Sequence, residues 1–529
     1  MTSTPASAPL AALSSAIPQP FKVAVVMRAL VAAIMVPFML WWSGSGTLLA
    51  AFGGDNAIYF LTANYFSPYA EPLAVAGHIA ASSSFPPLYP LLLALTGGGQ
   101  SLAMAHLVTA VMLVLALVMA YRCGCVLGLS RNQAMMTLLL FASCRITLLQ
   151  ALETHSEHLY LLFALGACAA LAHPPVRGNR LLLATLAVSA GYLTRTFGLT
   201  LVVSLLVWLV MHRPRHGWLY AATVLGVVGW WSGWHSGSAH YLANMETLYG
   251  DRGWFEQLTR NVNTLWPSWL GCFAEPGQAG FLPVLPAMLA LFAAAGLALR
   301  LRAQSFDGSY VLAYLALMTV WPYGAEYQRM LYPLLPLLFA YAVLAATATA
   351  RHMRPLRRLL TPLLGVVVLA AELPFVVLVL TRLLTPPADP GYAPYLHSQA
   401  WYFVDPATAF SALAYDRAIT EALSDIRVHQ RVPPGECLVA AKPSVVAAYS
   451  GIRVDGLPPF NADDADLLQT LRAGRCHYLF MTLAASPTFP QAYFPYHRLR
   501  QQLLPITVYL LPLAAPDQPA AVLMRLAPP

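Results

Sequence analysis

The stretch LVTAVMLVLALVMA at residues 107–120 decides the class of fold, because it contains no charged side chain. Extended by a few residues on each side, it is long enough to form a helix across the ~30 Å hydrocarbon core of a bilayer. A second run, LLGVVVLAAELPFVVLVL at residues 363–380, has the same character and includes one acid, Glu372. An ionisable residue inside a membrane helix is a functional candidate by default, and the role of Glu372 stays open. The two runs predict a protein that crosses a membrane.

The composition of the whole chain agrees with these runs. Its 529 residues are 58% hydrophobic and 10% charged, with a mean hydropathy of +0.61, whereas soluble domains carry about 25% charged residues. So much apolar surface does not fit inside one aqueous core. The net charge of +8 comes almost entirely from arginine, since the only lysines are Lys22 and Lys442. We interpret this excess as loop charge that fixes topology rather than as a nucleic-acid surface.

Hydropathy predicts an α-helical polytopic membrane protein with about eleven transmembrane helices, or roughly ten to thirteen if proline breaks are counted differently. The expected spans are 24–42, 102–121, 134–150, 157–172, 181–194, 197–212, 217–234, 281–299, 309–323, 330–349 and 359–382. Residues 1–21 are expected to form a disordered cytoplasmic tail, 22–384 the membrane module, and 385–529 a soluble domain. An odd number of spans places the two termini on opposite sides of the membrane.

The loop charges predict which side is which. With the N-terminus inside, every inside loop is basic, as the positive-inside rule requires. These loops hold Arg122, Arg131, Arg177, Arg180, Arg213, Arg215, Arg300, Arg302, Arg351, Arg354, Arg357 and Arg358. Only one acid, Asp307, falls inside, and the outside loops hold Asp55, Glu71, Glu153, Glu157, Glu246, Asp251, Glu256, Glu275 and Glu326. Arg252 and Arg260 are exceptions outside, and Arg145 falls within a span. Because nearly all of these loop acids lie on the outer side, we predict an external cavity that is lined by carboxylates.

Two outside segments are long. Residues 43–101 are expected to contain two short helices lying along the membrane surface, and residues 235–280 form a polar loop whose tryptophans favour the interface. After residue 385 the composition changes to a small α/β pattern of alternating helices and short strands. Cys437 and Cys476 fall in this last domain, where they form either one disulfide or two free thiols.

An acid and two arginines on the predicted outer side carry the chemistry. Asp55 opens the first outside segment, where its carboxylate suits a general base on a hydroxyl acceptor. The alternative is an N-cap for the following helix. Arg195 and Arg329 run against the positive-inside trend, and guanidinium groups suit bidentate capture of phosphate. The alternative is that each arginine lies at the end of a membrane helix and extends its guanidinium group to the membrane–water interface.

The stretch LETHSEH at residues 152–158 raises the possibility of a metal site. Its acids Glu153 and Glu157 are four residues apart, and its histidines His155 and His158 are three apart, so a helix would bring them together. A zinc site usually needs three or four well-placed ligands, and the sequence has no His-Glu-x-x-His motif. We therefore expect no metal and no other cofactor.

Taken in order, these motifs resemble those of the GT-C superfamily of membrane glycosyltransferases, and most closely the protein O-mannosyltransferase and aminoarabinose lipid A transferase branch. The matching points are Gly54-Asp55 through Tyr59, Pro86-Pro87-Leu88-Tyr89-Pro90, Ser156-Glu157, Leu193-Thr194-Arg195, and RMLYPLLP at residues 329–336. The terminal soluble domain also fits. The resemblance covers nearly the whole chain.

The resemblance implies transfer of a sugar from a polyprenyl phosphate or pyrophosphate carrier to an acceptor hydroxyl, with inversion at the anomeric carbon. It implies that Asp55 is the base, and that Arg195 and Arg329 hold the donor phosphate with help from Tyr327. The cavity would be lined by Glu157, His155, Tyr59, Tyr89 and Glu326. Many members carry a second acid beside the first, whereas here Asn56 follows Asp55, which weakens a metal-assisted site.

The implied location is the bacterial inner membrane, with the N-terminus cytoplasmic and the C-terminal domain periplasmic. The acceptor is a lipid, a glycan or a protein, and the sequence does not define the sugar or the carrier. Three other functions stay open. The chain could be a transporter or flippase of a lipid-linked or anionic substrate, an O-antigen ligase or polymerase-like enzyme, or a catalytically dead relative that serves as a scaffold.

Overall fold

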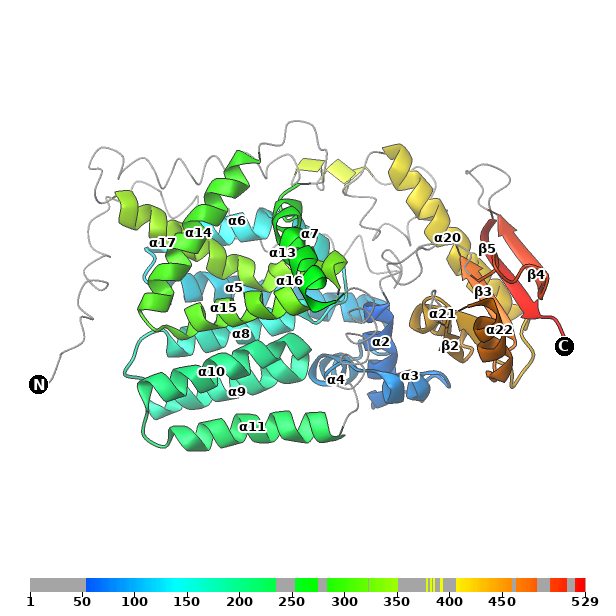
Figure 1. Cartoon of the computed structure of the whole chain (residues 1–529), viewed down its shortest axis with the longest axis horizontal. Coiled ribbons are helices and arrows are strands. Elements are labelled where there is room, and N and C mark those ends of the chain that lie inside the picture. The colour runs from blue at the N-terminus through cyan, green and yellow to red at the C-terminus, as the bar shows by residue number, and fades with distance from the viewer. Residues whose placement is uncertain are drawn as a thin grey trace, which may run out of the picture.

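The computed structural model joins a helical body to a smaller α/β domain (Figure 1). It describes residues 54–234, 253–274, 283–321, 323–350, 377–378, 381–382, 384–385, 391–392, 406–458, 463–482, 495–510 and 519–528. In Figure 1 the helical body lies on the left and the α/β domain on the right, with helices α2 to α4 between them. These helices come from the first predicted outside segment, so that segment connects the two parts.

The helical body contains a helix in every predicted span between residues 102 and 349. Its helices are α5 (Leu102–Val126), α6 (Arg131–Ser143), α7 (Arg145–Ala151), α8 (Glu157–Leu171), α9 (Gly178–Thr194), η2 (Thr196–Gly198), α10 (Leu199–His212), α11 (Gly217–Trp234), α13 (Trp254–Gly271), α14 (Val284–Arg302), α15 (Phe306–Val320), η3 (Gly324–Glu326), α16 (Tyr327–Leu331), η4 (Tyr332–Leu334) and α17 (Leu335–Ala350). The predicted span 24–42 and almost all of 359–382, including Glu372, lie outside the described residues.

Length and hydropathy support the membrane character of this body. Within the described ranges, three helices are long and apolar enough to cross a bilayer, namely Leu102–Val126, Val284–Arg302 and Tyr327–Thr349. Helices α6 and α7 form a fourth if they are one span, bent by 62°. Shorter apolar helices such as Glu157–Leu171 have 15 residues and rise ~22 Å, less than the ~30 Å hydrocarbon core. The mostly helical class is confirmed, and the number of crossings stays a prediction.

A buried ion pair explains the one acid predicted on the inner side. Arg300 donates to both carboxylate oxygens of Asp307, at 2.9 and 2.6 Å, and the Tyr341 hydroxyl donates to the same carboxylate at 2.7 Å. Helix α14 approaches α17 so closely that a Cβ on Gly296 would lie 2.2 Å from the Tyr341 carbonyl oxygen. Asp307 is therefore a structural acid that joins α14, α15 and α17.

The two outside segments hold more helix than predicted. The first contains three short helices instead of two: α2 (Asp55–Phe66), α3 (Ala76–Ser82) and α4 (Leu88–Leu95). The second, predicted as a loop over 235–280, contains α13, whose mixture of tryptophan and polar residues hid its helical period. The Asn261 amide donates to the carbonyls of Thr319 and Trp321, both at 2.9 Å, and so ties α13 to the end of α15.

The C-terminal domain is a five-stranded sheet with helices, as the α/β pattern predicts. Its elements are α20 (Pro406–Val428), β1 (Leu438–Ala440), α21 (Pro443–Ser450), β2 (Val454–Gly456), α22 (Asp464–Ala473), β3 (Tyr478–Thr482), β4 (Leu503–Leu510) and β5 (Pro519–Leu526). The strand order is β2-β1-β3-β5-β4, with β1 parallel to both its neighbours and β5 antiparallel to both of its own. Strand β2 was not predicted, because three residues carry too little pattern.

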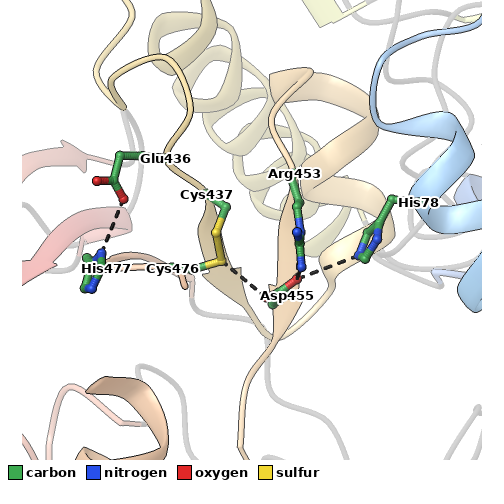
Figure 2. Close-up of a disulfide and its surroundings, with 7 residues drawn as sticks. All are labelled: His78, Glu436, Cys437, Arg453, Asp455, Cys476 and His477. Carbon is green, nitrogen blue, oxygen red and sulfur yellow. Dashed lines mark hydrogen bonds and ion pairs between the residues drawn. A yellow bond between two sulfur atoms is a disulfide. The ribbon is translucent and has the colours of Figure 1, made fainter. Parts of the chain in front are cut away.

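A disulfide joins Cys437 to Cys476, which settles the two alternatives left open by the sequence (Figure 2). The two cysteines are 39 residues apart in the chain and come just before β1 and β3. The bond therefore links the two central parallel strands of the sheet at the same end.

Candidate active site

Asp55 is the first residue of α2 and is not its N-cap. The N-cap is Gly54, at φ +44°, and no side chain caps the helix. The Asp55 carboxylate instead accepts a hydrogen bond from Arg329 at 2.6 Å, and 32% of the Asp55 side chain is exposed. The structure thus corrects the N-cap alternative and leaves one face of this carboxylate accessible.

Arg329 joins Asp55 to Glu157. Its Nε donates to Glu157 Oε1, and Arg195 forms an ion pair with the same oxygen. Glu157 is fully buried at the start of α8, and its second oxygen, Oε2, has no hydrogen-bond partner among the residues that the structure describes. Glu326, half exposed, is 3.6 Å from Arg329.

We call Asp55, Glu157, Arg195 and Arg329 the carboxylate–arginine cluster. Its members come from the start of α2, the start of α8, the turn after α9 and the short helix α16. All four were singled out from the sequence, and the structure brings them into direct contact although they are spread over 274 residues. Two negative and two positive charges balance within the cluster, so an anion that enters must exchange partners with a carboxylate.

Electrostatics keep Asp55 ionised at neutral pH. Burial raises the pKa of the Asp55 carboxyl, but the adjacent Arg329 guanidinium outweighs it and holds the pKa below its usual value. Burial and the charge of Arg329 lower the pKa of His155 to about 3, so this imidazole is neutral. Neither ring nitrogen of His155 makes a hydrogen bond within the described part of the chain, and its nearest acid is Glu153 at 3.9 Å.

Two tyrosines of the first outside segment support the cluster. The Tyr59 hydroxyl is 2.9 Å from the Ser156 hydroxyl, which directly precedes Glu157. The ring of Tyr89 packs edge-on against the ring of Tyr59 with 5.0 Å between centroids, and its own hydroxyl bonds to Thr109 at 2.8 Å. Tyr59 therefore lies beside the cluster, and Tyr89 lies one layer behind it.

The Tyr327 hydroxyl points toward backbone carbonyls. Its hydroxyl donates to the backbone carbonyls of Met318 and Trp321, and its side chain is fully buried. These carbonyls belong to the end of α15, so Tyr327 holds α16, and with it Arg329, against that helix. In this conformation Tyr327 positions an arginine instead of facing the cluster.

Sequence reasoning missed Tyr314 in α15. Its side chain is fully buried, and its hydroxyl has no hydrogen-bond partner in the described ranges. Its ring packs against Phe197, two residues after Arg195, with 4.8 Å between centroids. Tyr310 and Tyr314 are four residues apart in an apolar span, a spacing that places both on one helix face and that could have drawn attention to them.

The donor groups at the cluster do not favour a metal ion. Asp55 and Glu157 are both engaged by arginine. Among the described residues, the one group of three potential ligands whose donor atoms gather within 4.8 Å is Cys437, Asp455 and Cys476. Both of its sulfurs belong to the disulfide, so only a carboxylate is left there. Independence from metal stays a prediction.

The fold and the cluster together define a class: a mostly helical protein with apolar helices and a carboxylate–arginine cluster at one end of them. No protein-family model and no curated protein sequence matches the chain. Two solved structures share its fold. ArnT from Cupriavidus metallidurans in the apo state matches with a TM-score of 0.52 and 13% identity, over 95% of this chain and 98% of that one.

The second is the archaeal oligosaccharyltransferase AglB from Archaeoglobus fulgidus, in complex with an inhibitory peptide and a dolichol-phosphate. It matches with a TM-score of 0.50 and 13% identity, over 88% of this chain and 70% of that one. The chain therefore shares the overall fold of these two membrane proteins. At 13% identity the likeness establishes the fold, and the roles of individual residues rest on the geometry of the cluster.

Proposed function

We propose that this protein is a membrane glycosyltransferase that moves a sugar from a polyprenyl-phosphate-linked donor to an acceptor hydroxyl at the periplasmic face of the bacterial inner membrane. The observation that carries the proposal is the hydrogen bond from Arg329 to Asp55 at 2.6 Å, because it joins the proposed base to a proposed phosphate ligand. The charge pattern of the loops supports the periplasmic side, because the residues of the cluster lie in or beside segments that this pattern predicts to be outside.

Arg195 and Arg329 are the proposed phosphate ligands. Guanidinium groups bind phosphate through two parallel hydrogen bonds, and burial strengthens these bonds. Both arginines contact Glu157 Oε1, which holds them side by side. A donor phosphate would replace part of these contacts, and Glu157 would keep the two side chains in place.

Asp55 is the proposed general base. It takes the proton from the acceptor hydroxyl while that oxygen bonds to the anomeric carbon. The bond from the anomeric carbon to the phosphate oxygen breaks, and its electron pair leaves with the lipid phosphate. Arg195 and Arg329 stabilise the charge that develops there. One displacement of this kind inverts the anomeric centre.

The shared arginine couples donor binding to the base. The charge and hydrogen bond of Arg329 oppose the effect of burial and lower the pKa of Asp55, which weakens its basicity. When Arg329 turns its hydrogen bond from Asp55 to the phosphate, burial acts with less opposition and Asp55 becomes a stronger base. The base is thus strengthened at the moment when the donor is in place.

Product analysis tests the function. Cells that lack the gene are compared with cells complemented by the wild type, by Asp55→Asn, or by Glu256→Gln, which changes an exposed acid on α13. Mass spectrometry of envelope lipids, glycans and proteins should show the loss of one sugar mass in the deletion strain. The wild type and Glu256→Gln should restore it, and Asp55→Asn should not. Identical envelope profiles in all four strains would contradict the proposal.

A further inference from the structure

The C-terminal domain shares a hydrophobic core with the helix that begins at Asp55. Buried apolar side chains of the first outside segment join those of the domain in a single cluster, among them Ala57, Leu61, Val75 and Ile79 on one side and Ile419, Leu423, Val445 and Val446 on the other. In Figure 1, α21 lies next to α2 and α3. The domain therefore packs directly on the element that carries the proposed base.

One hydrogen bond reaches the turn that sets the position of Asp55. The Ser444 hydroxyl, near the start of α21, donates to the carbonyl oxygen of Gly54 at 3.1 Å. The same carbonyl accepts the first hydrogen bond of α2, from the Ile58 amide at 3.0 Å. Gly54 has no side chain to cap the helix, and its φ of +44° is one that other residues rarely adopt. Ser444 thus supplies, from the C-terminal domain, a side-chain hydrogen bond to a turn that has no side-chain cap of its own.

The domain also approaches the neighbouring helix α3. His78 Nε2 is 3.7 Å from an Asp455 carboxylate oxygen, which also pairs with Arg453 at 3.4 Å (Figure 2). Asp455 lies in β2, and its other oxygen is 3.3 Å from the sulfur of Cys476 in the disulfide. The domain therefore contacts α2 through α21 and comes close to α3 through β2.

We infer that the C-terminal domain holds the Gly54–Asp55 turn in its reactive position, with Ser444 as the positioning residue. This inference rests on the proposed function of Asp55 as the base. Ser444 is buried, and its hydroxyl would lose its hydrogen bond to the Gly54 carbonyl if the domain moved away. It acts through Gly54 and needs no contact with substrate. The C-terminal domain is then part of the catalytic apparatus.

The test compares Ser444→Ala and Ser444→Thr with Ser450→Ala in the full-length protein. Ser450 is a matched control, because it is also buried on α21 but its hydroxyl bonds within the C-terminal domain, donating to the Val446 carbonyl at 2.7 Å and accepting from the Ile452 amide at 3.2 Å. Ser444→Ala should lower kcat by roughly 5- to 10-fold, about the worth of one hydrogen bond, with an unchanged KM for the donor. Ser444→Thr keeps the hydroxyl and should restore the rate, and Ser450→Ala should leave it unchanged.

Hydrogen exchange at Ile58 gives a readout that does not depend on activity. In Ser444→Ala the Ile58 amide should exchange faster by a similar factor, while Ser450→Ala should leave its exchange unchanged. Unchanged exchange at Ile58 in Ser444→Ala would overturn the inference, whether or not sugar transfer is detected. Equal losses of rate in Ser444→Ala and Ser450→Ala would also overturn it. If Ser444→Ala is fully active while Asp55→Asn is inactive, the proposed function stands and the inference fails.

Discussion

Replacement of Arg329 by glutamine separates the two roles that the cluster gives to this side chain. Glutamine keeps a hydrogen-bond donor but removes the charge that contacts Asp55 and Glu157. A charge-assisted hydrogen bond to phosphate is worth about 1.5–3 kcal/mol, which corresponds to roughly a 10- to 150-fold change in affinity. Arg329 contacts the carboxylates of Asp55 and Glu157, so phosphate replaces one of these partners instead of adding a contact. We therefore expect a loss of donor affinity near the lower end, about 10-fold.

The same substitution should move the pH dependence of transfer. Asp55 acts as a base only when ionised, so the rate falls as the pH drops through its pKa. In the wild type, burial raises that pKa, and Arg329 more than offsets the effect of burial. Without Arg329 the pKa rises, and the acidic limb of kcat/KM should shift to higher pH.

The assay measures transfer by purified protein at a series of pH values and donor concentrations. Arg431→Gln serves as the control, because Arg431 is an exposed arginine that pairs with Asp425 in the C-terminal domain. If Arg329→Gln leaves both the donor dependence and the acidic limb unchanged, Arg329 contacts neither the phosphate nor the base, and the reasoning is refuted.

Three further predictions follow from the described contacts. The Tyr314 hydroxyl has no hydrogen-bond partner among the described residues, and as a donor ligand its loss in Tyr314→Phe should lower donor affinity by roughly 3- to 10-fold. Tyr65→Phe, which changes an exposed ring, should keep the wild-type affinity, and equal affinities of the two variants would remove Tyr314 from the site. Because the pKa of His155 is about 3, the pH profile between 5 and 8 should keep its shape in His155→Gln, and an inflection near 6.5 that disappears in this variant would contradict a neutral imidazole. Cys437→Ser should lower the stability of the C-terminal domain by ~2–4 kcal/mol in thermal unfolding, and an unchanged midpoint would show that the disulfide contributes nothing.

Much of the helical body could be predicted, because an apolar run that is long enough to cross a bilayer leaves few alternatives to a helix. Helix α13 could not, since its tryptophans and polar residues match an interfacial loop as well as a helix. Strand β2 has only three residues, and it exists because β1 offers it a parallel partner. Such elements are defined by tertiary contacts that a local pattern does not contain.

The cluster was partly predictable for a different reason. Asp55, Arg195 and Arg329 stood out because ionisable groups beside membrane spans are rare, and the resemblance put them in order. Their mutual contacts depend on three-dimensional packing, as does the turn of Tyr327 toward backbone carbonyls. The bond between Ser444 and Gly54 crosses 390 residues, and a serine near a helix start is too common to suggest it.

The central claim is that Asp55 removes the proton from the acceptor during sugar transfer. The most direct measurement is the single-turnover rate of Asp55→Asn at saturating donor, beside Glu256→Gln and the wild type. Loss of a general base should lower this rate by roughly 10²–10⁴-fold, with folded protein and donor binding retained, while Glu256→Gln should match the wild type. A rate for Asp55→Asn close to that of the wild type would contradict the account.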